Sequence, residues 1–261
     1  MASHLTTNQA IIFCECPRKY YLRHIKGASP SYDQAHVLDM AKARAFLALF
    51  KNERRFLSEV GDQSELRECY ARCLDMAIAT SISQSAPHIM GADPKEMEAH
   101  IERELEVFLL GRIERAKRHM GTFGITGEEL AISVTYPPED VGRRVVDFKH
   151  RISGRISLIH AEPDFARPIQ ISTAMPPMKG ICKGEEMAAK MNALLLEELV
   201  GRPVVASSIH YLKISETRSI AIGESNKEEV KSFVSQVTGK CDFEKSSGAC
   251  AFCEVRGECG Q

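Results

Sequence analysis

The sequence contains no tryptophan and carries almost no net charge. Its 34 Lys and Arg residues are balanced by 35 Asp and Glu residues, which gives a formal net charge of −1 at pH 7. A protein that attracts nucleic acid through a global positive field has a clear excess of basic residues. Any nucleic-acid binding by this chain must therefore be local. The absence of tryptophan excludes no fold class.

Long apolar runs are also missing. No stretch approaches the roughly 18–20 consecutive apolar residues that a membrane-spanning helix requires. Residues 1–8 lack the basic and then apolar pattern of a secretory signal. We therefore expect a cytoplasmic protein with no membrane partner. With 261 residues, 44% of them apolar, the chain can form one large domain or two modest ones, each with a real core.

Cysteine, by contrast, is plentiful: the chain has nine, an odd number. In a reducing compartment, clustered cysteines indicate metal ligands and scattered ones indicate core residues. Cys250, Cys253 and Cys259 form a cluster near one end of the chain. Two cysteines three residues apart can bind one metal centre from a tight turn, and a third can close on the same centre. Three thiolates leave a tetrahedral or cubane site one ligand short.

We expect Cys16 to supply the fourth thiolate, because Pro17 ends the local helix and fixes the turn beside it. Cys14 and Cys241 are alternatives for this position. Four thiolates suit zinc as well as an iron–sulfur cluster, and spacing alone does not decide between them. The remaining cysteines are predicted to be core residues: Cys69, Cys73 and Cys182.

One segment near the first cysteines combines basic and aromatic residues. Its candidate nucleic-acid-binding residues are Arg18, Lys19, Tyr20, Tyr21 and Arg23. Guanidinium groups that meet phosphates and rings that stack on bases are typical of a single-stranded nucleic-acid path. An alternative interpretation is a solvated helix face with its tyrosines packed inward.

Hydrophobic periodicity divides the chain into four regions: 1–30, 31–125, 126–240 and 241–261. The second region has apolar residues at three- and four-residue spacing and is predicted to be a helical lobe. Its expected helices are 33–51, 64–85 and 94–119. In the third region the period changes to two, and we expect a mixed α/β core. Its expected strands are 129–136, 143–151, 154–160, 168–173, 204–213 and 218–222, and its expected helices are 184–200 and 226–238.

This order of elements, bracketed by Cys16-Pro17-Arg18-Lys19-Tyr20 and the terminal cysteines, resembles a known family. It is similar to the RecB-like iron–sulfur nucleases, closest to the CRISPR-associated RecB-family exonucleases. Supporting segments are Gly154-Arg155-Ile156 at the start of a strand, Ala193–Glu198 on a helix, and Tyr211-Leu212 in the following strand. The resemblance spans nearly the whole chain except 50–125. It implies a PD-(D/E)XK restriction-endonuclease-like α/β (α+β) core and a [4Fe–4S] cluster held by Cys16, Cys250, Cys253 and Cys259.

The catalytic positions of the family are not retained. Where the family has a histidine, an aspartate and Glu-x-Lys, this chain has Leu47, Ser157 and Gln170-Ile171-Ser172. The family's Gln and Tyr on the following helix correspond to Ala188 and Asn192. Phosphodiester cleavage with magnesium or manganese needs carboxylate oxygens, because these are hard cations. We therefore expect no Mg²⁺ or Mn²⁺ site and no catalytic residues at these positions.

The expected function is that of a pseudo-nuclease with an iron–sulfur cluster. It would bind nucleic acid, single-stranded DNA in preference to RNA, or serve as a scaffold for protein subunits of a CRISPR-type or recombination-type assembly. The alternative is an active single-stranded DNA exonuclease whose carboxylates have moved to Asp147, Glu162 and Asp164, beside His160. Against that alternative, Glu162-Pro163-Asp164 has the composition of an ordinary polar turn. A protein-interaction module that uses the helical lobe is a third class.

Overall fold

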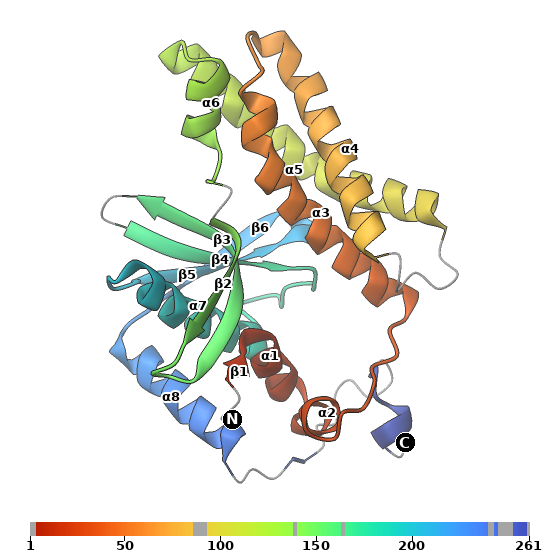
Figure 1. The fold of residues 1–261 in the computed structure, drawn as a ribbon, viewed down its shortest axis with the longest axis vertical. Helices are drawn as coiled ribbons and strands as arrows, with labels where there is room; N and C mark the ends of the chain where they lie inside the picture. The colour runs from red at the N-terminus through yellow and green to blue at the C-terminus, as the bar shows by residue number, and fades with distance from the viewer. Residues whose placement is uncertain are drawn as a thin grey trace.

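The computed structural model describes residues 4–85, 93–137, 140–162, 165–239, 243–244 and 253–259. In these ranges the chain forms a mixed α/β structure, with a column of helices on one side of a sheet and a second group of helices on the other (Figure 1). The helices are α1 (Thr7–Glu15), α2 (Pro17–Tyr20), α3 (Gln34–Leu57), α4 (Leu66–Ser85), α5 (Pro94–Phe123), α6 (Gly127–Val134), α7 (Lys183–Val200) and α8 (Glu224–Thr238). The strands are β1 (Leu5–Thr6), β2 (Val141–Asp147), β3 (Ile152–Glu162), β4 (Phe165–Ser172), β5 (Ala206–Tyr211) and β6 (Glu216–Ala221).

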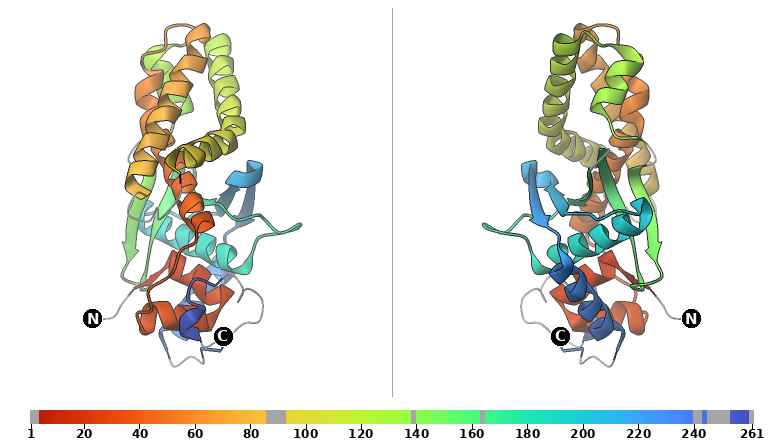
Figure 2. Two further views of the ribbon diagram at one scale, coloured as in Figure 1. Left: turned by 90° about the vertical axis from the view of Figure 1, so that its right-hand side faces the viewer. Right: turned by 90° about the vertical axis from the view of Figure 1, so that its left-hand side faces the viewer.

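Helices α3–α6 lie together as one group, the helical lobe (Figure 2). The lobe was predicted over 31–125, so α6 joins it from the region that was predicted to belong to the α/β core. Helix α5 begins as expected, with Asp93 accepting a hydrogen bond from the backbone N–H of Lys95 and with Pro94 in its first turn. It ends at Gly124, whose φ of 65° is the left-handed conformation that favours glycine. A continuous apolar core joins these helices and reaches the sheet at Leu158 and Ile169. The three predicted helices of this lobe are confirmed; α3 and α5 are longer than expected and α4 is slightly shorter.

Residues 129–136 were expected to be a strand, and this prediction is wrong: they belong largely to helix α6. Leu130, Ala131 and Val134 are buried at helical spacing, whereas Ile132 between them is 57% exposed. The β-branched residues of this segment favour a strand locally. Burial of one helical stripe in the core of the lobe outweighs that preference.

The described strands form one six-stranded mixed sheet in the order β1-β3-β4-β5-β6, with β2 paired to β3. Strands β2, β3 and β4 are consecutive antiparallel neighbours. Strands β4 and β5 are parallel, and helix α7 provides the crossover that a parallel pair needs. The remaining five predicted strands are confirmed as β2–β6 with shifted bounds.

Helix α7 covers one face of the sheet and packs against α1 and α8 (Figure 1). It matches the predicted helix 184–200 and ends at Gly201 as expected. Helix α7 can approach α1 closely because residue 184 is a glycine. A Cβ atom at Gly184 would lie 3.1 Å from the Cα of Ile11. On the opposite face, Phe46 of α3 stacks on His210 of β5 with a centroid separation of 5.5 Å.

Segments from the two ends of the chain lie side by side. Residues 253–259 pack beside α2 and the residues that follow it (Figures 1 and 2). In the part of the chain that the structure describes, no helix combines the length and the apolar character needed to cross a membrane.

Candidate functional site

A buried carboxylate anchors the segment 253–259 to the N-terminal region. The side chain of Glu254 is 4% exposed and bridges two cations: Nζ of Lys19 lies 3.0 Å from Oε2, and Nη1 of Arg23 lies 2.8 Å from Oε1. The backbone N–H of Ser31 also donates to the carbonyl oxygen of Glu254, at 2.9 Å. Burial opposes the charge of Glu254, but its hydrogen bonds and the two cations hold its pKa below the ordinary value. We call this arrangement the terminal junction.

Two of the predicted cluster cysteines lie directly at the terminal junction. Cys16 is the N-cap of α2, and its Sγ accepts a hydrogen bond from the backbone N–H of Lys19 at 3.4 Å. Lys19 therefore contacts Cys16 through its backbone and Glu254 through its side chain. Cys253 immediately precedes Glu254, and Cys259 ends the same segment in a short helical turn.

The remaining predicted ligand, Cys250, lies outside the described residues, and so does Cys241, an alternative to Cys16. Among the residues that the structure describes, no three His, Cys, Asp or Glu side chains come together as a group able to hold a metal. Cys16, Cys253 and Cys259 thus do not complete a metal centre by themselves. A four-thiolate centre at the terminal junction depends on Cys250.

The other cysteines differ from one another in their surroundings. Cys14 lies on α1 and faces α7, because its Cβ is 3.3 Å from the place where a Cβ of Gly184 would stand. Burial raises the pKa of its thiol. Cys69 and Cys73 are core residues of the helical lobe, as predicted. Cys182 is exposed, so its prediction as a core residue is wrong.

The structure separates the members of the basic-aromatic segment. Lys19 and Arg23 are ion-paired with Glu254, and Tyr20 is 6% exposed and packs edge-on against Phe13. These three side chains hold the terminal junction together. Arg18 and Tyr21 are half-buried, with the guanidinium carbon of Arg18 5.3 Å from the centroid of the Tyr21 ring. The side chains of Lys19 and Arg23 are each 15% exposed, so four of the five members keep partial access to solvent and only Tyr20 is fully buried.

The positions that correspond to the family's catalytic residues in the sheet come together where β3, β4 and α7 meet. Oγ of Ser157 accepts a hydrogen bond from the backbone N–H of Ile171 at 3.2 Å. Nδ2 of Asn192 donates to Oε1 of Gln170 at 3.3 Å. Oδ1 of Asn192 is buried without a hydrogen-bond partner among the described residues. All three side chains are neutral, so they bring no carboxylate pair to the site. Leu47, on α3, instead packs against the core of the helical lobe.

A buried carboxylate that sequence reasoning missed lies next to these positions. Glu185 of α7 is 7% exposed and accepts hydrogen bonds from the hydroxyls of Ser172 and Tyr211, the latter at 2.8 Å. Burial and the bond to Glu185 raise the pKa of Tyr211 far above its ordinary value. The two acceptor oxygens of Glu185 are both occupied by side chains of this chain.

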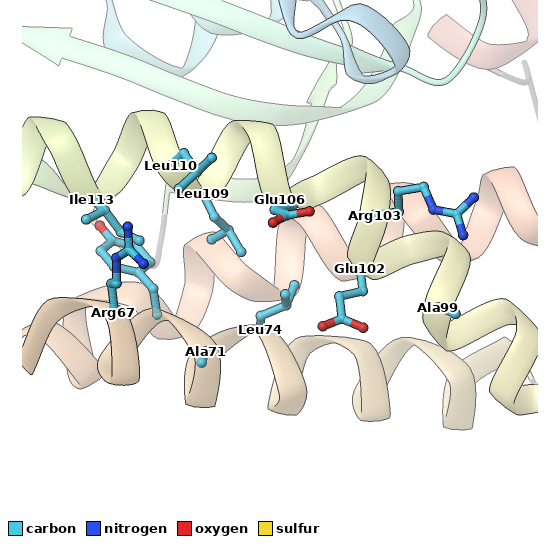
Figure 3. Close-up of a pocket in the computed structure, with 11 residues that line it drawn as sticks. Arg67, Ala71, Leu74, Ala99, Glu102, Arg103, Glu106, Leu109, Leu110 and Ile113 are labelled. Carbon is cyan, nitrogen blue, oxygen red and sulfur yellow. The ribbon is translucent and has the colours of Figure 1, made fainter.

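The helical lobe contains a separate pocket of about 500 Å³ between α4 and α5 (Figure 3). Its floor is apolar, and charged side chains of both signs stand around it, as in many small-molecule sites. The floor includes Leu74, Leu109 and Ile113, and the charged residues are Arg67, Glu102, Arg103 and Glu106. No residue predicted from the sequence as a site residue lines this pocket.

No protein-family model matches this chain, and no curated protein matches it at a significant level. The likeness to RecB-like nucleases therefore stands on the residues quoted in the sequence analysis.

Proposed function

We propose that this protein is a catalytically inactive RecB-like iron–sulfur protein that acts as a nucleic-acid-binding or scaffold subunit of a CRISPR-type or recombination-type assembly. The observation that carries the proposal is that neutral groups stand at Ser157, Gln170 and Asn192, with Ser157 bonded to the backbone of Ile171 and Asn192 bonded to Gln170. A hard divalent cation needs free carboxylate oxygens, and Glu185, which contacts Ser172, is buried with both oxygens hydrogen-bonded. A lysine to orient the attacking water is also missing from this strand.

The terminal junction supports the proposal that the protein holds an iron–sulfur cluster. Cys16 and the segment that carries Cys253 and Cys259 are brought together by the clamp around Glu254. A [4Fe–4S] cluster would be held by these three thiolates and Cys250, and it would supply folding free energy at this junction. Zinc in the same four thiolates is the alternative.

The geometry argues against an exonuclease with relocated carboxylates. Asp147 pairs with Ile152 at one end of β3, whereas Glu162 lies at the other end of that strand. Ten steps at about 3.3 Å each place these two positions roughly 30 Å apart, too far to share metal ions. Asp147 is also 1% exposed and bonded to His150. Asp164 lies outside the described residues.

The experiment that tests the proposal uses anaerobically purified protein. Iron, zinc and sulfide are measured first, followed by cleavage of end-labelled single-stranded DNA in the presence of manganese. We expect about four irons per chain and no cleavage. Cys253→Ser should lose metal and melt at a lower temperature, whereas Cys182→Ser, an exposed cysteine outside the predicted set, should retain both. Manganese-dependent cleavage that is lost on substitution of Glu162 or Glu185 would contradict the pseudo-nuclease proposal.

A further inference from the structure

The hairpin formed by β2 and β3 concentrates positive charge on a protein whose overall charge is near zero. Between residues 143 and 155 the chain has five Lys or Arg residues and one acidic residue, Asp147. Asp147 is turned inward, 1% exposed, and bonded to His150. The cations all lie exposed: Arg143, Arg144, Lys149, Arg151 and Arg155. Among the described residues, none of them has a carboxylate within ion-pair distance, so their charge is available to a partner.

Two of these cations are forced together by the strand register. Arg144 on β2 lies directly opposite Arg155 on β3. Like charges on directly opposite residues of an antiparallel pair are destabilising, and no neighbouring acid compensates them here. A third cation comes from α3: the place where a Cβ of Gly142 would stand is 3.9 Å from Cδ of Arg155 and 4.0 Å from Nζ of Lys51. An anionic partner would relieve the repulsion within this cluster.

An exposed aromatic ring follows this strand. Side chains alternate along β2, so Arg144 and Val146 share one face, and Phe148 lies in the turn directly after the strand. Val146 is 44% exposed and Phe148 is 77% exposed, with its ring edge-on to His4 at 5.0 Å. A large ring left in solvent and flanked by Arg144, Lys149 and Arg151 has no role in the core. Bases can stack on such a ring while their phosphates contact the cations.

A shallow pocket lies between Arg144 and Arg155. It is lined by the two arginines, Ser153, Gly154 and residues 6–8 at the start of α1. The polar side chains of this lining add hydrogen-bond donors beside the guanidinium groups.

We propose that this face of the β2–β3 hairpin binds single-stranded nucleic acid, with Lys51, Arg144 and Arg155 on the phosphates and Phe148 stacked on a base. The proposal deepens the function proposed above by naming a site that differs from the basic-aromatic segment at Arg18 and Tyr21. The biological role of this site rests on the function proposed above, whereas the binding itself does not.

The test is fluorescence anisotropy with the full chain and a labelled single-stranded DNA of about 20 nucleotides and mixed sequence. We expect R144Q/R155Q to weaken binding about tenfold and to reduce the slope of log K against log salt by about 1.4, since two phosphate contacts are lost. Phe148→Ala should weaken binding about fivefold or more. The matched controls R115Q/R118Q and F123A change exposed residues of the helical lobe and should bind as the wild type does.

A stability measurement separates loss of the site from loss of the fold. Removal of the Arg144–Arg155 repulsion should leave the melting temperature of R144Q/R155Q unchanged or slightly higher while binding falls. Unchanged binding by R144Q/R155Q, or loss of binding in R18Q instead, would overturn the hairpin site alone. Equal affinity for duplex DNA, or arginine-dependent binding to anionic vesicles without binding to the oligonucleotide, would overturn the assignment of single-stranded nucleic acid. Iron content and cleavage, measured on the same preparations, report on the proposed function independently.

Discussion

Arg112 donates two hydrogen bonds to the carboxylate of Glu53, from Nε to Oε1 and from Nη2 to Oε2, each 2.8 Å long. The hydroxyl of Tyr70 donates to the same Oε1 at 2.6 Å, and Nη2 of Arg112 also donates to the carbonyl oxygen of Val134. Arg112 lies on α5, Glu53 on α3, Tyr70 on α4 and Val134 on α6. One buried polar network therefore joins all four helices of the lobe.

Arg112→Met should lower the free energy of unfolding by about 3–5 kcal/mol, because it leaves the buried carboxylate of Glu53 without its cation. Urea denaturation followed by circular dichroism measures the change. The matched variant Arg54→Met removes the partly exposed pair with Glu128 and should cost about 1 kcal/mol or less. If the two variants lost the same free energy of unfolding, the buried network would contribute no more to the stability of the lobe than the partly exposed ion pair does.

Glu254→Gln should destabilise the protein at neutral pH by about 2 kcal/mol, since hydrogen bonds to a charged group are lost at the terminal junction. The pKa of Glu254 is depressed in the folded protein, so its contribution is present above the unfolded value, near 4.5, and is lost as pH falls through the folded value. The stability difference between wild type and variant should therefore shrink below about pH 4.5. Glu258→Gln, an exposed neighbour in the same segment, should behave as wild type at every pH.

Tyr211→Phe should cost about 2 kcal/mol, because it removes one of the two hydroxyls that donate to the buried carboxylate of Glu185. Thermal unfolding compares it with Tyr136→Phe, whose hydroxyl has no hydrogen-bond partner among the described residues and whose loss should be nearly neutral. If the two variants have the same melting temperature, Glu185 does not depend on Tyr211 for its burial.

Gly154→Ala should destabilise the fold by about 1–3 kcal/mol through overpacking. Its new Cβ would lie 2.8 Å from Cγ2 of Thr7 and 2.9 Å from Cδ1 of Leu195, so α1 and α7 would have to move away from β3. Gly111→Ala is the control, since nothing lies within 4 Å of a Cβ there and alanine is the better helix former; it should stabilise α5 by about 0.5–1 kcal/mol. Denaturant midpoints of the two variants should move in opposite directions.

The parts of the fold that were predictable carry local signals. Asp93 and Pro94 start a helix, Gly201 ends one, and a period of two marks five of the strands. The error at α6 arose because β-branched residues fit either structure until the surrounding core selects one face.

The interior polar contacts could not be predicted, because their partners are distant in the sequence. Glu254 and Arg23 are 231 residues apart in the sequence, and neither segment contains a local pattern that identifies the other as its partner. Glu185 has the local sequence of an exposed residue, but it is buried against Ser172 and Tyr211 of the sheet. Cys182 has the local sequence of a buried residue, but it is exposed. The cations between 143 and 155 were visible in the sequence, but only the strand register shows that Arg144 and Arg155 share one face.

The two sides of the terminal junction are synthesised at different times. Lys19 and Arg23 leave the ribosome early, whereas Glu254 is made more than two hundred residues later. At about 5–20 residues per second, this delay is on the order of ten to fifty seconds. During that interval α2 has no acidic partner from residues 253–259, and the sheet and the helical lobe can form first. Closure of the junction is then a late step of folding, and a protein stalled before it would have Arg23 without its carboxylate and Lys19 paired with Glu15 alone.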